Sequence, residues 1–466
     1  MMYIIGKIIY RSVIIVVLYL TTNLAILPNY TEKLNNDFCD NVHYYYSDEV
    51  GVDVAALISK HQEAVTARLD LIANAKESID IAQFYFNSDK YGTLILGEIL
   101  RAAERGVKVR IVIDGKYRHF TGFDNEVLTS LNAHPNITFK LFEPFNLFKP
   151  WTVNNLLHDK IMIIDKYRAV VSGRNIANRY LSTEAYNYVF DIDHIITFTG
   201  EISRFAESAV KQLMDYFETM WNSPYTKDPR KVKVKEDHYQ KILNNYKDYR
   251  YMHPEYFTTK INIMALSVPT NKIILIANPL NRVKKPKIWC EIASLINNAK
   301  EEVYINSPYV VPTEDIKGQL KNLNQLDITV ITNSAGSTPN YFAFSGYLRY
   351  KKELLKYDNI KLYEYQGGGS LHSKSYIIDN RISIVGSYNL DPRSTYLSTE
   401  IMLVIDSEPY AQKLKEVHVN YISQSLQAKS LYEYHAGDIP MLDIKKGKKF
   451  TLEIMRHVAY LFDHLL

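Results

Sequence analysis

The sequence predicts an α/β protein made of two similar domains that follow an N-terminal membrane segment. Three observations indicate this organisation: an order of strands and helices that occurs twice, a polar motif repeated with unchanged spacing, and an uncharged apolar stretch near the N-terminus. Short β-branched strands that alternate with helices are typical of layered α/β domains. The chain has 466 residues, enough for two or three domains that each bury a core.

The composition excludes several classes of protein. The chain is 47% hydrophobic and 23% charged, which excludes a disordered or fibrous protein. Its net charge of +4, from 55 basic and 51 acidic residues, is too balanced to make nucleic acid an expected partner. The two cysteines, Cys39 and Cys290, exclude a disulfide framework and a Cys-based zinc site. They do not fix the redox compartment.

Residues 1–31 are predicted to form a signal peptide or a membrane anchor. Lys7 and Arg11 precede an uncharged stretch over residues 12–31, as in signal peptides and in helices that cross a bilayer. No clear small-residue cleavage site follows, which favours an uncleaved anchor; a buried N-terminal helix is the alternative. The protein is therefore expected to be membrane-associated or exported. Because the positive charges precede the stretch, the body is expected on the non-cytoplasmic side.

The first domain is predicted over residues 50–222. Its expected strands cover residues 78–86, 107–114, 137–145, 156–165 and 169–172, with a helix over 92–105. Short apolar, β-branched strands that alternate with a helix support these assignments.

The second domain is predicted over residues 288–466 and has the same order of elements. Its expected strands cover residues 302–311, 327–333, 360–365, 371–379, 382–386 and 400–406, with helices over 314–324 and 348–357. The segment 223–287 is charged and rich in tyrosine, fits neither repeat, and is expected to connect the domains. Its basic run, 282–287, is interpreted as solvated surface.

Each repeat carries one copy of a four-residue motif. In both copies Lys follows His by two positions, Asp by seven and Asn by seventeen. On a strand, positions two apart share a face, so His and Lys should point together while the Asp, at an odd spacing, points away. The first copy is His158, Lys160, Asp165 and Asn175, and the second is His372, Lys374, Asp379 and Asn389.

The paired motifs resemble the HKD signature of the phospholipase D superfamily, and the match is closer still to bacterial cardiolipin synthases of the short type. The second half adds the segments 307–312 (SPYVVP), 346–349 (GYLR) and 386–394 (GSYNLDPRS). The resemblance implies two phospholipase D-like α/β/α domains with pseudo-twofold symmetry and one shared active site. The chain departs from the family at Ser172, where Gly is usual, and over 340–345, where such synthases often carry a His; the second departure leaves the lipid substrate open.

The resemblance also implies roles for individual residues. His158 is expected to attack phosphorus and form a covalent phosphohistidine, while His372 acts first as general acid and then as base. The HKD residues Lys160, Asp165, Lys374 and Asp379 complete the expected catalytic set. Phosphate binding is expected from Asn175, Ser387 and Asn389. By position Asp191, with Asp193 as the alternative, should orient the His of the first half and Glu400 that of the second. No metal or other cofactor is expected.

The expected function is that of a phosphatidyltransferase like cardiolipin synthase. Its expected partners are a membrane, a phospholipid substrate, and a small alcohol or a second phospholipid as acceptor. The alternatives are a phospholipase D-type hydrolase, a nuclease, and a non-catalytic binder on the same fold. At the C-terminus, a basic run at 445–449 precedes an apolar stripe from Leu452 to Leu465 with helical period. This segment is expected either to dock on the core or to lie at a lipid surface.

Overall fold

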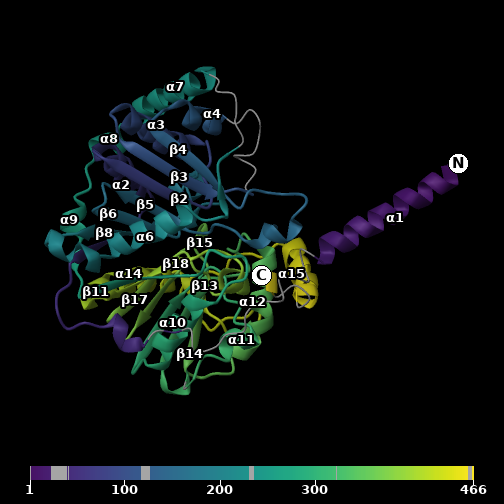
Figure 1. Ribbon diagram of the computed structural model, residues 1–466. Coiled ribbons are helices and arrows are strands. Elements are labelled where there is room, and N and C mark those ends of the chain that lie inside the picture. Colours follow the sequence, from purple (N-terminus) through teal and green to yellow (C-terminus); the bar gives the residue numbers. More distant parts are fainter. Residues whose placement is uncertain are drawn as a thin grey trace.

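The computed structural model of the protein describes residues 2–22, 39, 41–116, 126–229, 236–321, 323–459 and 464–465. Two α/β domains lie one above the other in Figure 1, and helix α1 (Met2–Thr21) projects from them to one side. Each domain is a mixed β-sheet with helices packed against it.

The first sheet has nine strands in the order β10-β1-β8-β6-β5-β2-β3-β4-β9. Neighbours β2, β3 and β4 are parallel, while β5, β6, β8 and β1 continue the sheet with antiparallel pairs. The strands are β1 (Asp53–Ile58), β2 (Ser78–Gln83), β3 (Lys108–Asp114), β4 (Ile137–Phe142), β5 (Lys160–Ile164), β6 (Arg168–Ser172), β8 (Asp193–Phe198), β9 (Thr226–Lys227) and β10 (Val268–Pro269).

The second sheet has eight strands in the order β11-β18-β17-β16-β12-β13-β14-β19. Again three neighbours, β12, β13 and β14, are parallel, and the other pairs are antiparallel. The strands are β11 (Lys272–Ala277), β12 (Glu302–Asn306), β13 (Asp327–Asn333), β14 (Ile360–Tyr365), β16 (Ser375–Ile378), β17 (Ile382–Gly386), β18 (Ile401–Asp406) and β19 (Ser425–Gln427).

The sheets match strand for strand, from β1 and β11 at one side to β9 and β19 at the other, and only β10 has no counterpart. The predicted repeat of two α/β domains is thus confirmed. The helix expected over 348–357 is longer and earlier, as α12 (Tyr341–Leu354), because the Asn340 side chain caps it by accepting from the backbone N–H groups of Phe342 and Ala343. The helix expected over 314–324 is the short α11 (Glu314–Lys317).

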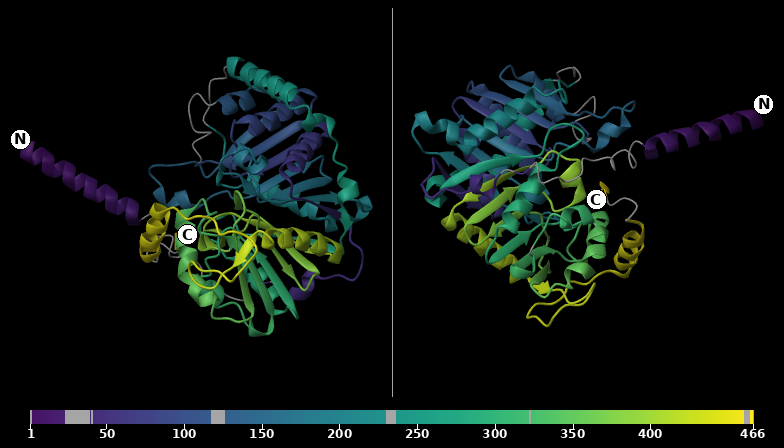
Figure 2. Two further views of the ribbon diagram at one scale, coloured as in Figure 1. Left: turned by 180° about the vertical axis from the view of Figure 1, so that it is seen from behind. Right: turned by 60° about the horizontal axis from the view of Figure 1, so that its bottom comes forward.

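Helices cover both faces of each sheet (Figures 1 and 2). In the first domain α2, α3 and α7 enclose one apolar core, and in the second α10 and α12 enclose another. A third core fills the space between the domains, where α6 and α14 each pack on both sheets. These helices are α2 (His61–Asn74), α3 (Lys90–Glu104), α4 (Glu126–Ala133), α6 (Ala209–Trp221), α7 (Glu236–Met252), α10 (Lys287–Asn297) and α14 (Glu408–Ile422).

The segment 223–287, expected as a connection, is divided between the domains. Helix α7 packs on α3 and α4, and β10 extends the first sheet, whereas β11 pairs along its whole length with β18 of the second. Residues 272–277 therefore belong to the second sheet, ahead of the predicted boundary at residue 288. The interpretation of its basic run as solvated surface was wrong in part: Lys284 is fully buried and donates to Asn155 Oδ1 at 3.0 Å, and Arg282 pairs with Glu143.

The predicted N-terminal segment is described only in part. Helix α1 covers residues 2–21, its described side chains from Tyr10 to Tyr19 are exposed, and residues 23–31 lie outside the described part. Within that part, no helix has the length and hydropathy needed to cross a membrane. After the N-terminal segment, Cys39 forms a disulfide with Cys290 of α10, a bond that the count of two cysteines did not predict.

The C-terminal segment contains α15 (Lys446–Val458), which packs on α12. Leu452 is fully buried in the core of the second domain, so the docked alternative is confirmed for this helix. Leu461 and Phe462, part of the expected apolar stripe, lie outside the described residues.

Candidate active site

A β-bridge between the domains places His158 beside Glu400. Leu157 of the first domain pairs in parallel with Thr399 of the second, and the next residue of each segment carries the polar side chain. His158 Nδ1 lies 2.8 Å from Glu400 Oε1, and Glu400 is fully buried. The other carboxylate oxygen accepts a 2.5 Å hydrogen bond from Ser387 Oγ. An acid of the second domain therefore orients the histidine of the first.

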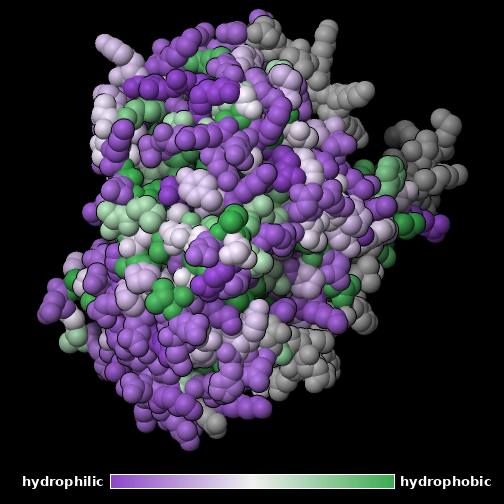
Figure 3. All heavy atoms as spheres, turned by 60° about the vertical axis from the view of Figure 1, so that its left-hand side comes forward, coloured by the Kyte–Doolittle hydropathy of each residue, from purple (hydrophilic) through white to green (hydrophobic). Residues whose placement is uncertain are grey.

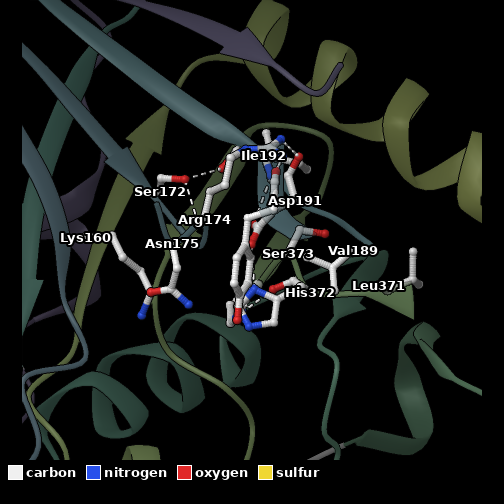
Figure 4. Close-up of polar contacts among 12 residues, drawn as sticks. Lys160, Ser172, Arg174, Asn175, Val189, Asp191, Ile192, Leu371, His372 and Ser373 are labelled. Atoms are coloured by element: carbon white, nitrogen blue, oxygen red, sulfur yellow. Dashed lines mark hydrogen bonds and ion pairs between the residues drawn. The ribbon is translucent and has the colours of Figure 1, made fainter. Parts of the chain in front are cut away.

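A second contact between the domains does the same for His372. Strand β15 (Ser370–Leu371) pairs in parallel with β7 (Val189–Phe190), and the chains continue into His372 and Asp191. His372 Nδ1 lies 2.6 Å from Asp191 Oδ2, and Asp191 Oδ1 accepts from the Ile192 N–H (Figure 4). Gly173 packs against the Asp191 carboxylate so closely that a Cβ there would collide with it. The acid of the first domain thus orients the histidine of the second.

The predicted assignment of the orienting acids was right in identity and wrong in pairing. Asp191 was expected to serve His158 and Glu400 to serve His372, but the structure exchanges them. The expectation rested on distance along the chain, whereas the bridges that bring the groups together run between domains. Both histidines also precede strands β5 and β16 rather than lying within them.

Lys160 and Lys374 are buried beside the histidines. Each donates to the carbonyl oxygen of the His two residues before it. Lys374 Nζ also lies 2.8 Å from His372 Nδ1. Because the Asp191 carboxylate can only accept, we assign the Nδ1 proton to the bond with Asp191. Lys374 is then a neighbouring positive charge.

Burial dominates the electrostatics of the site. Burial, and then Lys160, holds the pKa of His158 well below its ordinary value, and burial with Lys374 lowers the pKa of His372 to about 3. Burial lowers the pKa of Lys160 to about 7 and that of Lys374 to about 8. The free site therefore holds neutral imidazoles beside lysines that titrate near neutral pH.

The two orienting acids have different pKa shifts. Burial raises the pKa of Glu400 to about 8, against the opposing effect of Lys160. Burial also acts to raise the pKa of Asp191, but Lys374 and His372 outweigh it and hold that pKa below its usual value. Asp191 is thus a permanent carboxylate, while Glu400 titrates in the working range of pH.

The three residues expected to bind phosphate differ in their surroundings. In Figure 4, Asn175 and Lys160 point toward the side on which the His372 ring lies. Asn389 Oδ1 is buried and has no hydrogen-bond partner within the described residues, whereas Ser387 is engaged by Glu400. Over the described ranges, no group of three or more His, Cys, Asp or Glu side chains has an arrangement that could hold a metal ion.

Asp165 and Asp379, expected among the catalytic residues, lie away from the site. Asp165 accepts hydrogen bonds from the backbone N–H groups of Lys76, Glu77 and Ser78, at the start of β2. Asp379 does the same for residues 300–302 at the start of β12. The catalytic assignment of both was wrong, and the odd spacing that predicted an outward direction was right: they stabilise the ends of strands.

Asp193, the alternative to Asp191, belongs to a buried network of ion pairs and hydrogen bonds and does not contact either catalytic histidine in the described residues. It forms an ion pair with Arg68 and accepts a 2.5 Å hydrogen bond from Ser172 Oγ. Arg174 donates to Asp193 and also to the backbone carbonyls of Tyr180 and Asp191. Ser172, the departure from the family pattern, therefore contributes a bond that a glycine could not make.

Two aromatic residues of the site were not predicted. The Phe84 ring lies 4.9 Å from the His158 ring, centroid to centroid, and the Lys160 ammonium lies 5.2 Å from its centre. Tyr180 packs edge-on to His372 at 5.2 Å. Phe84 directly follows β2, the strand that pairs with β5, and this pairing is the signal that would have placed it next to the first motif.

Comparisons with known proteins agree with this geometry. A family model described as "Cardiolipin synthase, PLD-like domain" matches residues 69–221 and 292–420. Cardiolipin synthase C of Escherichia coli K12 is 28% identical over 399 residues, covering 76% of this chain and 82% of that protein. An uncharacterized protein of Helicobacter pylori is 25% identical over 419 residues, covering 80% of each chain.

The fold is also similar to a solved enzyme. The crystal structure of phosphatidylserine synthase from Haemophilus influenzae superposes with a TM-score of 0.64 at 18% identity, covering 92% of this chain and 100% of that one. With the family match over both halves, these findings identify the chain as an enzyme of the phospholipase D superfamily that belongs to the cardiolipin synthase family of PLD-like domains.

Proposed function

We propose that this enzyme transfers a phosphatidyl group from a phospholipid to an alcohol, as a cardiolipin synthase does, through a covalent phosphohistidine. The observation that carries the proposal is the pair of crossed His–acid contacts at one site, each built across the domain interface. Two-histidine chemistry needs one imidazole to attack and another to supply a proton, and the site holds both.

His158 is the proposed nucleophile. An ionised Glu400 accepts a hydrogen bond from His158 Nδ1–H, which leaves the lone pair on Nε2 free to attack phosphorus. The P–N bond forms as the P–O bond to the head-group alcohol breaks, and His372 Nε2–H delivers a proton to the departing oxygen. Lys160 and Lys374 stabilise the negative charge that develops on the phosphoryl oxygens.

His372 fits the acid role because Asp191 stays ionised beside it. The imidazolium is stabilised by that carboxylate at 2.6 Å. In the free site burial lowers the pKa of His372 to about 3, so His372 must take up a proton from solvent when the substrate binds. An anionic phosphodiester between Lys160 and Lys374 offsets their positive charge, which favours protonation of His372.

The second half of the cycle reverses the first. Neutral His372 takes the proton of an incoming alcohol, whose oxygen attacks phosphorus and releases His158. An acceptor phospholipid with a free hydroxyl yields a lipid with two phosphatidyl groups, glycerol yields a phosphatidylglycerol, and water yields phosphatidate. The cardiolipin synthase C relative and the family match favour a phospholipid acceptor over water.

We also propose that the body of the enzyme resides in an oxidising compartment, in association with a membrane. The Cys39–Cys290 disulfide supports this location because such bonds persist mainly outside the cytosol. The basic residues Lys7 and Arg11 lie ahead of an apolar stretch, and this order supports the same location for the body.

Product analysis with labelled phosphatidylglycerol tests the proposal. The full-length protein in detergent is expected to form cardiolipin and free glycerol. Phosphatidate as the main product would identify a hydrolase instead, and cleavage of DNA or RNA without any lipid product would overturn the lipid substrate. The His158→Ala variant should form no product, whereas His435→Ala, at an exposed histidine remote from the motifs, should retain full activity.

A further inference from the structure

An exposed apolar loop precedes the first catalytic histidine. Phe145, Leu147 and Phe148 are 60%, 65% and 85% exposed, and Trp151 is 38% exposed. Aromatic and aliphatic side chains gathered in this way on a protein surface mark a contact with an apolar partner. The same segment continues through Asn155 to His158, which follows Trp151 by seven residues.

Helix α15 presents a second apolar stripe. Phe450, Ile454 and Val458 lie four residues apart on one side of the helix and are 68%, 50% and 46% exposed. Leu452, on the side that faces α12, is fully buried. Packing within the protein therefore accounts for one side of α15 and leaves the stripe of Phe450, Ile454 and Val458 uncovered.

The loop, α15 and α1 lie on the same side of the molecule. In Figure 1 and in both views of Figure 2, α1 projects from the side on which α15 and the segment around residue 150 are found. The Tyr19 hydroxyl donates to the Phe148 carbonyl oxygen at 3.4 Å, which joins the end of α1 to the loop. Figure 3, which brings the left-hand side of Figure 1 forward, shows a mostly hydrophilic face with scattered apolar residues.

Positive charge accompanies the apolar side chains. Lys149 is exposed within the loop, and Lys445, Lys446 and Lys449 are exposed at the start of α15. An apolar surface bordered by lysines matches a bilayer with anionic head groups, where the acyl region takes the apolar side chains and the phosphates take the ammonium groups. A protein partner would not require apolar side chains that are bordered by lysines.

We propose that the loop 145–151 and the exposed stripe of α15 form a surface that inserts into an anionic phospholipid bilayer and holds the catalytic site at its edge. This inference rests on the proposed lipid substrate and adds the route by which the lipid arrives. A head group leaving the bilayer beside Trp151 is then only a few residues of chain from His158.

Tryptophan fluorescence offers a direct test on the full-length protein. The chain has 3 tryptophans, of which Trp221 and Trp289 are 9% and 1% exposed. Vesicles of phosphatidylglycerol and phosphatidylcholine that carry bromine on their acyl chains should quench Trp151, because bromine quenches only at short range. Trp151→Phe should remove the quenching, and pure phosphatidylcholine or high salt should weaken it.

Kinetics test the link to catalysis. The double variant Leu147→Ser/Phe148→Ser should raise the KM for vesicle lipid about tenfold, because it removes inserted apolar area. Its activity on a short-chain phosphatidylglycerol dissolved as monomers should be unchanged, which also shows that the variant is folded. A matched control is the double variant Ile202→Ser/Tyr251→Ser. Ile202 is 81% exposed in the short 3-10 helix η7 (Ile202–Glu207), and Tyr251 is 87% exposed in α7.

The outcomes separate this inference from the proposed function. Turnover of monomeric lipid with no quenching of Trp151 would overturn the docking surface and leave the function standing. Quenching without any lipid product would support the surface and count against the function. Equal losses in the loop variant and in the control variant would show a general effect of lost apolar area and would overturn the assignment to this side.

Discussion

His158 and His372 each meet an acid from the opposite domain, so neither histidine is functional within its own repeat. The acids differ, because Asp191 is held as a carboxylate by Lys374 and His372 while burial raises the pKa of Glu400 to about 8. The near-symmetric site is thus electrostatically asymmetric. This difference favours a proton donor at His372 and a nucleophile at His158.

Replacing either histidine should stop turnover without unfolding the protein. His158→Ala and His372→Ala are each expected to lose most activity, and the double variant should be little worse than either single one, since the two imidazoles act as a unit. Initial rates on phosphatidylglycerol, with circular dichroism to check folding, measure this. Substantial activity in either single variant would contradict the two-histidine cycle.

Glu400→Gln and Asp191→Asn should each lower kcat/KM by about 10²–10⁴-fold, because an amide cannot hold the imidazole in the required tautomer. Glu400 must be ionised to accept from His158, and below its pKa of about 8 it becomes protonated. Wild-type activity is therefore expected to rise with pH as Glu400 loses its proton, and loss of the protons from Lys160 and Lys374, whose pKa values are about 7 and about 8, opposes that rise over the same range. The pH profile of Glu400→Gln activity should lack the rise on the acidic side. An unchanged rise would show that another group causes it.

At the scale of elements, the HKD aspartates support strands. Asp165 joins the end of β5 to the start of β2, and Asp379 joins β16 to β12 in the same way. Both lie in the left-handed region, with φ 50°, so each also shapes the turn that follows its strand.

Asp165→Asn should therefore lower stability and leave the chemistry of the folded enzyme intact. In this variant an uncharged amide replaces the carboxylate that accepts hydrogen bonds from several backbone N–H groups. The change is expected to lower the free energy of unfolding by about 1–3 kcal/mol. Denaturant titration and kcat at a temperature where the variant is folded measure the two effects separately. A large fall in kcat with unchanged stability would return Asp165 to the catalytic set.

The sequence predicts contacts within a repeat better than contacts between repeats. Both motifs and several strands of the second half follow from local sequence patterns, and β13, β14 and β17 have the expected bounds. Strand β11 was instead expected in the connecting segment, and β19 was not predicted. The exchange of Asp191 and Glu400 depends on two bridges between domains, which no local pattern encodes. The burial of Lys284 likewise depends on Asn155, far away in the chain.

At the scale of the whole molecule, the Cys39–Cys290 bond ties the segment after α1 to the second domain. It closes a loop across 251 positions that includes the entire first domain. Removing such a bond commonly costs about 2–5 kcal/mol in stability. The disulfide therefore fixes residue 39 to helix α10.

Mass spectrometry of the protein as purified, without reductant, should show no free thiol, and Cys290→Ser should unfold at a lower temperature. Two alkylated cysteines in enzyme isolated from its native membrane would contradict the disulfide and the oxidising compartment.

The central claim is that a phosphatidyl group passes through His158, and the adduct itself tests it most directly. Full-length enzyme mixed with labelled phosphatidylglycerol and quenched in alkali, where phosphohistidine survives, would be digested and its labelled peptide sequenced by mass spectrometry. The account predicts a phosphatidyl adduct on His158 that is absent from His158→Ala and that decays when glycerol or a second phospholipid is supplied. An adduct on His372, or efficient turnover with no adduct at all, would contradict it.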